Sequence, residues 1–358
     1  MPLTIEGSRV PTQWLERKPS SRVMPINRRS PKDGYIRMAL INNMPDPALE
    51  DTELQFFDLL DGASEDVPVL VKLFSLTGVP RTERGMRHLN SFYSGIDELW
   101  DSQFDALIMT GTEPHQTNLR HEPYWQTLAS VLDWAEQNTF STILSCLAAH
   151  AGVLYSDGIE RHRLSDKRFG VFDFAKSAEH ALTTRTTDAV RFPHSRWNEV
   201  RSDALKACGY IVLTQSAEAG VDCFVKRKKK SLFVHFQGHP EYGEHTLLKE
   251  YRRDIKRFLR RERETYPTMP DGYFGTEARK VLNQFRQSAL SHGTEDVMTA
   301  FPEEFLFKHL QNTWRSSATR IYGNWMRYVQ SRKNEVSAFP VASTDAYSNV
   351  LPKRSVLP

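Results

Sequence analysis

The chain has 358 residues, of which 39% are hydrophobic and 25% are charged, and its formal net charge is +3. This is the composition of an ordinary globular protein, and so weak a charge gives no reason to expect a nucleic-acid partner. No apolar stretch approaches the length needed to span a bilayer, and residues 1–7 lack the basic start and apolar middle of a secretory signal. We therefore expect a cytoplasmic protein that binds neither membrane nor nucleic acid.

The three cysteines are too few and too unevenly spaced for a disulfide framework or a CxxC metal site, so no metal is expected. Cys208 and Cys223 lie beside or within short strand patterns, and we expect both to be small buried side chains. Only Cys146 has the local context of a reactive thiol.

The first half of the chain alternates strand and helix patterns. Residues 1–34 hold several Pro, Arg and Ser residues without a period, which predicts an N-terminal extension laid over the surface or partly mobile. The expected strands are 36–41, 67–74, 106–109 and the run before Cys146, and the expected helices are 48–60 and 123–137. This alternation predicts an α/β fold, a mainly parallel sheet flanked by helices, in a catalytic domain over residues 35–265.

The later part of this domain is expected to contain a loop, several short strands and one long helix. The loop is 193–197, the strands are 210–214, 223–225 and 232–235, and the helix is about 244–263. The basic run 226–230 lies between two of the strands, which is typical of a solvated hairpin tip. The alternative is that this run attracts a polyphosphate such as the nucleotide end of coenzyme A.

The rest of the chain is helical in pattern. Helices are expected at about 276–289, 302–311 and 318–330, and the apolar stripe of the last one predicts that residues 266–330 dock on the α/β domain. From residue 331 the pattern decays into Ser, Pro and Asn, which predicts a loosely ordered tail over 331–358.

The apolar run 141–145 ends in Cys146, and small helix-forming residues follow at once. This pattern predicts a nucleophile on a strand-to-helix turn, with the thiol exposed at the carboxyl end of the strand. The first free backbone N–H groups of the next helix would favour a thiolate and, later, an oxyanion.

A second apolar run, 231–236, leads to His239 and Glu241. Sites in parallel sheets gather beyond the carboxyl ends of the strands, so we expect these two side chains to meet Cys146 there. Nucleophile, base and orienting carboxylate would then form a triad for acyl transfer. His235, inside the run, is expected to be a buried strand residue.

The cysteine turn together with His-x-Glu resembles the flavodoxin-like fold of the class I glutamine amidotransferases. Members of that family surround their cysteine with glycines and a glutamine, whereas Ser145, Leu147 and Ala148 flank Cys146 here. The chain after residue 264 is also too short and too helical to hold an ATP-dependent synthetase. A glutaminase-type hydrolase of the same fold stays as an alternative.

The chain is more similar to the homoserine O-succinyltransferase family, which is built on this fold. The matching marks run in family order from about residue 36 to 330. They are Asn43-Met-Pro45, His88-Leu-Asn-Ser-Phe-Tyr93, Thr110-Gly111, Tyr124-Trp125, Cys146, Phe169-Gly-Val171, Pro193-His-Ser-Arg196, Gly238-His-Pro-Glu-Tyr242, Glu250, Arg253-Asp254, Trp314-Arg-Ser316 and Asn324-Trp325.

The resemblance implies a ping-pong transfer of a succinyl group from succinyl-CoA to the hydroxyl of L-homoserine, in methionine biosynthesis. Cys146 would carry the acyl group as a thioester, His239 would be the base and Glu241 would hold its imidazole. The N–H of Leu147 and one from the loop 111–114 would bind the oxyanion. No cofactor is required beyond the coenzyme A thioester, and a homodimer is implied.

By position, Lys167, Ser195 and Arg253 match the substrate-binding residues of the family, and Arg253 suits bidentate capture of a carboxylate. The family position that separates succinyl from acetyl donors, with Gly for succinyl and Glu for acetyl, corresponds to His115. A protonated His115 would pair with a succinyl carboxylate, while a neutral ring would fill the space that succinyl needs. Glu113 would repel an anionic acyl chain if it faced the pocket.

Several alternatives to the succinyl-transfer prediction remain open. In one alternative the donor is acetyl-CoA instead of succinyl-CoA. In another the acceptor is a different hydroxy amino acid, such as serine. A binding or regulatory module that has lost the chemistry is the alternative that involves no catalysis.

Overall fold

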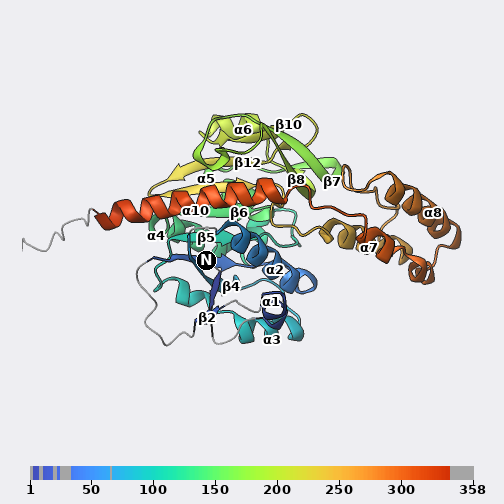
Figure 1. Ribbon diagram of the computed structural model, residues 1–358, viewed down its shortest axis with the longest axis horizontal. Coiled ribbons are helices and arrows are strands. Elements are labelled where there is room, and N and C mark those ends of the chain that lie inside the picture. The colour runs from blue at the N-terminus through green and yellow to red at the C-terminus, as the bar shows by residue number, and fades with distance from the viewer. Residues whose placement is uncertain (1–2, 8–10, 19–21, 25–33, 65–66, 339–358) are drawn as a thin grey trace, which may run out of the picture.

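The computed structural model describes residues 3–7, 11–18, 22–24, 34–64 and 67–338. Within these residues, nine strands form a central sheet and four strands form a second sheet (Figure 1). Helices cover both faces of the central sheet, so the predicted α/β fold with a mainly parallel sheet flanked by helices is confirmed.

The central sheet places the predicted strands side by side. Its order is β2 (Arg22–Met24), β1 (Thr4–Glu6), β4 (Val69–Phe74), β3 (Ile36–Ile41), β5 (Ala106–Met109), β6 (Ser141–Ser145), β13 (Ser231–Phe236), β12 (Cys223–Lys228) and β9 (Ile211–Val212). Neighbours from β2 to β13 pair in parallel, and β12 and β9 add antiparallel pairs at one edge. Strands buried on both faces are mainly apolar, which is why their sequences lack a regular alternation of apolar and polar residues.

Two hydrophobic cores lie on opposite faces of the sheet, and β3 contributes to both. Met38 and Leu40 belong to one core, and Ala39 and Ile41 belong to the other, because successive side chains of a strand point to opposite faces. The helices α2 (Asp46–Ala63) and α10 (Arg315–Ala338) pack into the first core. The helices α4 (Trp125–Asn138) and α5 (Leu147–Asp157) pack into the second.

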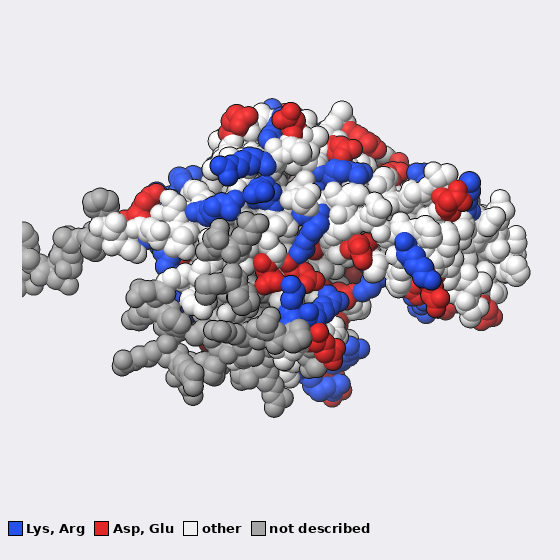
Figure 2. Space-filling model, in the orientation of Figure 1, with Lys and Arg blue, Asp and Glu red and all other residues white. Residues whose placement is uncertain are grey.

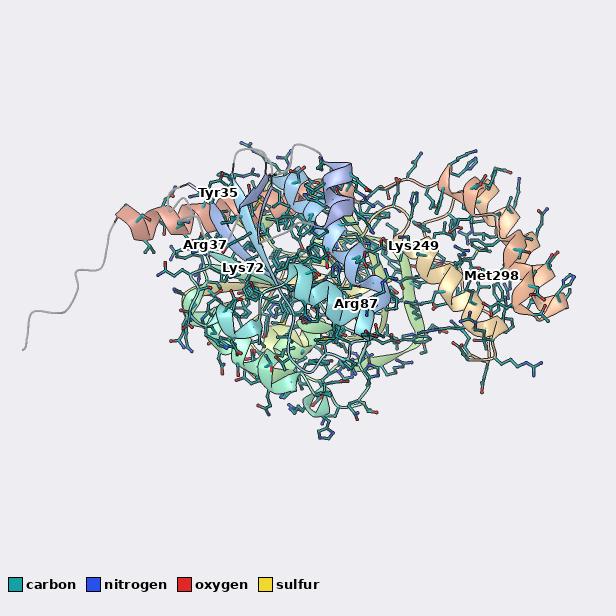
Figure 3. All side chains as sticks on the ribbon, turned by 90° about the horizontal axis from the view of Figure 1, so that it is seen from below. Tyr35, Arg37, Lys72, Arg87, Lys249 and Met298 are labelled. Carbon is teal, nitrogen blue, oxygen red and sulfur yellow. The ribbon has the colours of Figure 1, made fainter. Side chains whose placement is uncertain are left out.

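The prediction of a surface extension over residues 1–34 is wrong for β1. Glu6 of β1 pairs with Lys72 of β4 along the parallel ladder, and its carboxylate lies 3.7 Å from the guanidinium of Arg37 and 4.0 Å from the ammonium of Lys72. Leu3 and Trp14, the latter on α1 (Thr12–Arg17), are both fully buried. Figure 3 shows Arg37 and Lys72 beside the N-terminal strands. A three-residue strand is too short to give a periodic signal.

The second sheet was not expected from the sequence. Its order is β11 (Gly220–Val221), β10 (Thr214–Ser216), β7 (His162–Lys176) and β8 (Ala189–Glu199). The expected loop at 193–197 is therefore wrong, since these residues lie within β8, with Pro193 opposite Val171. β8 is an edge strand, where a proline does not interrupt the ladder between two neighbours.

The remaining helices lie between these strands or after them. They are α3 (Glu83–Phe92), α6 (Ser202–Ala207), α7 (Thr246–Leu259), α8 (Thr276–His292) and α9 (Glu303–Phe307), with 3₁₀ turns at Ile96–Leu99, Leu119–His121, Ala181–Thr183 and Glu295–Ala300. The segment 88–93, one of the family marks, belongs mostly to α3, whose start is capped by the Thr82 side chain.

The helix α10 ties the C-terminal segment to the central sheet. Trp325 donates its indole N–H to the Ser141 hydroxyl of β6 at 2.8 Å, and the Lys333 ammonium donates to the Asp105 carboxylate at 2.7 Å. In Figure 1, α10 runs from the left edge toward the centre of the molecule, while α8 projects on the right. The prediction of a loosely ordered tail is wrong for 331–338, which continue α10, and 339–358 lie outside the described residues.

The basic run 226–230 lies at a hairpin between β12 and β13, with 226–228 in β12 and only Lys229 and Lys230 at the tip. Part of its charge is paired, since the Lys226 ammonium lies 2.6 Å from the Asp157 carboxylate and the Lys229 ammonium 3.1 Å from that of Glu136. The view in Figure 2 likewise shows basic side chains interspersed with acidic ones. The alternative, attraction of a polyphosphate to this run, stays a prediction. Among the described helices, none is long and apolar enough to cross a membrane.

Candidate active site

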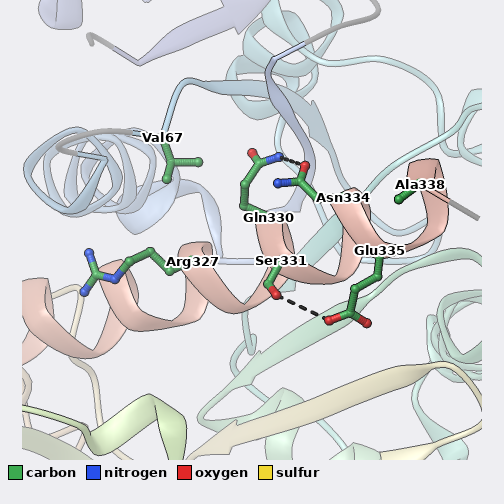
Figure 4. Close-up of a pocket in the computed structure, with 7 residues that line it drawn as sticks. All are labelled: Val67, Arg327, Gln330, Ser331, Asn334, Glu335 and Ala338. Atoms are coloured by element: carbon green, nitrogen blue, oxygen red, sulfur yellow. Dashed lines mark hydrogen bonds between the residues drawn. The ribbon is translucent and has the colours of Figure 1, made fainter.

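Two hollows in the described part of the molecule differ in their chemistry. One, of about 550 Å³, lies beside the last turns of α10, where Gln330 donates a hydrogen bond to Asn334 at 2.8 Å (Figure 4). Its lining holds no thiol and no imidazole. The other, of about 690 Å³, is lined by Cys146, His239 and Glu241. The predicted reactive residues therefore share one cavity, at the carboxyl ends of β6 and β13.

Cys146 occupies a strained turn between β6 and α5. Its backbone has φ 52° and ψ −112°, a conformation that a non-glycine residue adopts only when its surroundings impose it. Its N–H donates to the carbonyl of Phe236 on β13 at 2.8 Å, and its carbonyl accepts from Ala149 at 3.0 Å. The turn holds the thiol at the cavity and directs the N-terminus of α5 toward it.

The loop after β5 closes against this turn. A Cβ added to Gly111 would lie 2.8 Å from the backbone nitrogen of Leu147, so only glycine fits there. Asn43 fixes the loop from the other side, because its backbone N–H donates to the Thr110 hydroxyl at 2.8 Å and its side-chain amide to the Thr110 carbonyl at 3.2 Å. The structure therefore brings the N–H of Leu147 and the Gly111 loop together, beside Cys146.

His239 follows β13. Just before it, the backbone at Gly238 passes close to a buried polar pair, His194 and Asp222. A Cβ on Gly238 would lie 2.6 Å from the His194 ring and 2.8 Å from the Asp222 carboxylate. The Gly238 N–H donates to Asp222 at 3.0 Å, and the His239 N–H donates to the Pro193 carbonyl at 2.8 Å. The second sheet thus holds the segment that carries the imidazole.

Glu241 orients His239. The Nδ1 atom of His239 lies 2.9 Å from Oε1 of Glu241, which also accepts from the Ser145 hydroxyl at 3.3 Å. Burial by itself would lower the pKa of His239, but the charges of Cys146 and Glu241 and their hydrogen bonds to the ring raise this pKa well above its ordinary value. An imidazolium is the state of His239 that such surroundings favour.

Tyr242 connects the triad to the C-terminal segment. Its ring stacks on that of His239 with centroids 4.1 Å apart, and its hydroxyl donates to Glu250 at 2.7 Å. Its carbonyl accepts the indole N–H of Trp314 at 2.8 Å, and Trp314 is fully buried. The C-terminal segment therefore supports the wall of the cavity.

The three expected substrate-binding residues form one charged network. Lys167 on β7, Ser195 on β8 and Arg253 on α7 all line the cavity. The Lys167 ammonium lies 3.1 Å from Asp254 and 3.5 Å from Glu250, the Ser195 hydroxyl donates to Glu250, and Arg253 lies 3.2 Å from Asp254. Burial would raise the pKa of Glu250, but the charges of Lys167 and Arg253 outweigh it and lower this pKa.

His115 is the expected site residue that the structure does not bring to the cavity. It is exposed, it is absent from the described lining, and its backbone N–H donates to Glu122 at 2.7 Å. Glu113 of the same loop does line the cavity, with its carboxylate 3.7 Å from the guanidinium of Arg257. An ion pair with Arg257 reduces the repulsion that Glu113 would exert on an anionic acyl chain.

Sequence comparison agrees with this arrangement. The model of the family described as homoserine O-succinyltransferase matches residues 3–336. The chain belongs to this family. A homoserine O-succinyltransferase of Rhodopseudomonas palustris is 42% identical over 83% of this chain and 89% of the relative, and that of Methylococcus capsulatus is 38% identical over 91% and 92%.

Similarity to solved structures is much lower. A glutamine amidotransferase from Methylobacillus flagellatus shares 13% sequence identity, over 82% of this chain and 95% of that chain, with a TM-score of 0.45. Nothing about the chemistry of this member of the homoserine O-succinyltransferase family follows from that likeness.

Two contributions to the site of this family member were missed by sequence reasoning. Glu250 is the common partner of the substrate-binding residues, although the sequence showed it only as one of the family marks. Oε1 of Gln237 accepts from Nε2 of His150 at 2.9 Å behind the nucleophile and from the N–H of Val200, whose carbonyl accepts from the Gln237 amide. The one signal for Gln237 was its place as a polar residue directly after an apolar run. Apart from the family mark, nothing in the local sequence indicated the role of Glu250, because its partners Lys167 and Ser195 are distant in the sequence.

Proposed function

We propose that this protein is a homoserine O-succinyltransferase, which transfers the succinyl group from succinyl-CoA to the hydroxyl of L-homoserine. The observation that carries the proposal is the meeting of Cys146, His239 and Glu241 in one cavity of a chain that belongs to this family. A cysteine nucleophile with an oriented imidazole is the arrangement that acyl transfer through a covalent intermediate needs.

In the first half-reaction, the Cys146 thiolate attacks the thioester carbonyl of succinyl-CoA. The resulting oxyanion accepts hydrogen bonds from the N–H of Leu147 and from the loop at Gly111. The new bond joins the acyl carbon to the Cys146 sulfur, and the bond from that carbon to the coenzyme A sulfur breaks. The imidazolium of His239 protonates the departing thiolate, which leaves a succinyl-cysteine and a neutral imidazole.

In the second half-reaction, His239 removes the hydroxyl proton of L-homoserine as its oxygen attacks the succinyl-cysteine. The ester bond forms, the bond to the Cys146 sulfur breaks, and the thiolate and imidazolium are restored. Glu241 keeps the ring of His239 in the tautomer and orientation that both steps require.

The charged network on α7 suits the amino-acid substrate. Arg253 would bind the homoserine carboxylate, since its guanidinium is half exposed to the cavity. Lys167 and Ser195 would hold the same substrate from the second sheet. The carboxylates of Glu250 and Asp254 provide the negative charge that an ammonium group needs.

The reaction uses no metal and no cofactor beyond the coenzyme A thioester, and O-succinylation would prepare the hydroxyl for replacement by sulfur in methionine biosynthesis. A cytoplasmic homodimer is the state that the family resemblance favours. The same site would accept acetyl-CoA as donor or serine as acceptor if its pocket allowed.

The test is a turnover assay on the purified protein. With catalytic amounts of enzyme, we expect free coenzyme A thiol to appear only when succinyl-CoA and L-homoserine are both present. The Cys146→Ser variant should release no coenzyme A. Release of ammonia from glutamine, independent of coenzyme A, would instead establish the glutaminase-type alternative. Serine in place of homoserine, and acetyl-CoA in place of succinyl-CoA, test the remaining alternatives in the same assay.

A further inference from the structure

The basic side chains that line the cavity fall into two groups. The larger group lies within ion-pair distance of carboxylates and comprises Lys167, Arg196, Arg253, Arg257 and Arg263. Arg161, just before β7, and Arg163, at its start, line the same cavity, and among the residues that the structure describes neither forms an ion pair with a carboxylate. The cavity therefore contains one region with both signs of charge and one with positive charge alone.

The two arginines of the second group differ in their surroundings. Arg163 is exposed, and its guanidinium lies over the ring of Trp197, 4.5 Å from the centroid. Arg161 is half-buried, and its recorded hydrogen bond is a long one, 3.4 Å, to the carbonyl of Thr117. The charge of Glu122 acts on Arg161, but the two groups form no ion pair within 4.0 Å in the described structure.

A half-buried cation without a counterion has lost hydration and gained little in return. Burial lowers the pKa of Arg161 below its ordinary value, and Cys146 is among the groups whose negative charge opposes this. An anion bound in the cavity would supply the missing partner of Arg161. The region around Arg253 suits a zwitterionic amino acid, whereas a cation alone suits a group that is purely anionic.

The proposed donor has such a group close to its reacting carbon. The free carboxylate of a succinyl thioester is two methylene groups away from the carbonyl that Cys146 would attack. The pantetheine arm instead carries the coenzyme A phosphates far from that carbon. A cation that lines the same cavity as Cys146 and is influenced by its charge is therefore better placed for the acyl carboxylate than for the phosphates.

We infer that Arg161 binds the free carboxylate of the succinyl group, both on coenzyme A and on Cys146, and so selects a dicarboxylic acyl donor. This inference rests on the proposed function. His115, which the sequence suggested for this selection, lies outside the cavity lining, whereas Arg161 belongs to it.

The test compares succinyl-CoA with butyryl-CoA, which has an acyl chain of the same length but no carboxylate. Acylation of Cys146 is followed by mass spectrometry of the intact protein in native, Arg161→Gln, Arg161→Lys and Arg163→Gln forms. We expect Arg161→Gln to slow acylation by succinyl-CoA about 10- to 150-fold, the range for loss of one hydrogen bond to a charged group. Acylation by butyryl-CoA should be little changed.

The other forms make the comparison specific. Arg161→Lys should recover part of the preference for succinyl-CoA because it keeps the positive charge, and Arg163→Gln should show the native ratio between the two donors. Native protein that accepts butyryl-CoA as readily as succinyl-CoA would overturn the inference, whatever the variants do. So would an equal loss with both donors in Arg161→Gln, or a selective loss in Arg163→Gln alone.

Failure of the proposed function gives a different result. Native protein would then form no adduct with any thioester, and the inference would fall with it. A native protein that forms adducts without regard to the acyl carboxylate would overturn only the role of Arg161.

Discussion

Replacing Glu250 with Gln should separate the two half-reactions of this enzyme. The Glu250 side chain is 14% exposed and lies 3.5 Å from the Lys167 ammonium, and it accepts hydrogen bonds from the hydroxyls of Ser195 and Tyr242. An amide keeps the shape but loses the charge and one of the two acceptor atoms. Asp254 would still pair with both Lys167 and Arg253, so the change removes only the second anion of the network.

The magnitude follows from the interactions that are lost. A hydrogen bond to a charged group contributes about 1.5–3 kcal/mol, so one such loss in the complex with L-homoserine predicts a decrease of about 10- to 150-fold in kcat/KM for that substrate. Cys146 and His239 do not touch this network directly, so acylation by succinyl-CoA should proceed near the native rate.

The assay follows each half-reaction on its own. Formation of succinyl-enzyme in the absence of amino acid reports the first, and decay of that species on addition of L-homoserine reports the second. Glu303→Gln is a matched control, because it removes the carboxylate 2.7 Å from Arg252 on the same helix, away from the cavity. We expect Glu303→Gln to behave as the native protein in both steps.

A thermal melt of each variant checks that the fold is kept. If Glu250→Gln slowed acylation by succinyl-CoA as much as it slowed transfer to L-homoserine, the division of the cavity into acyl and amino-acid regions would be refuted. An unchanged dependence on L-homoserine would equally refute the assignment of the α7 network to that substrate.

Three further predictions follow from the site and the core. His239→Asn should reduce turnover by at least about 100-fold, the low end of general-base contributions. Near-native turnover would refute the assignment of His239 as the general base. Arg253→Ala should raise the KM for L-homoserine far more than that for succinyl-CoA, and an equal rise in both would place its role elsewhere. Burial lowers the pKa of His150 to about 3, of His194 to about 4 and of His235 to about 3, so below about pH 6.5 the unfolded chain binds protons that the folded protein excludes. The free energy of unfolding should then fall by up to about 1.4 kcal/mol per pH unit for each histidine as the pH is lowered, and equal guanidinium midpoints at pH 7 and pH 5 would contradict this.

The parallel strands of the central sheet were predictable because burial on both faces makes them continuous apolar runs. β3, β5, β6 and β13 were all expected within a residue or two of their observed bounds. β1 was missed because three residues carry no period, and it is held by its pairing with β4, which is distant in the sequence. A local sequence pattern does not reveal which distant strand a short segment will pair with.

The second sheet was missed for a different reason. The first part of β7 is largely exposed, and β8 buries polar side chains such as His194 and Arg196, so neither has the apolar pattern of a buried strand, and Pro193 further argued for a loop. Pairing between the two strands, rather than propensity, determines their conformation. This sheet carries Lys167 and Ser195, whose place at the site came from the family resemblance alone.

The reactive residues themselves were predicted to meet because each follows a strand of one parallel sheet. The structure brings Cys146, His239 and Glu241 into one cavity, as that reasoning required. It does not bring His115 there, because counting along a loop does not determine which side chain faces inward. Arg161 gave no signal in the sequence, since an arginine beside a strand is most often solvated.

The most direct test of the account is to weigh the intact protein after mixing it with succinyl-CoA in the absence of an amino acid. The account predicts a single succinyl adduct that maps to Cys146, is absent from Cys146→Ser and disappears when L-homoserine is added. An intact protein without an adduct from either succinyl-CoA or acetyl-CoA would contradict a ping-pong transfer through Cys146.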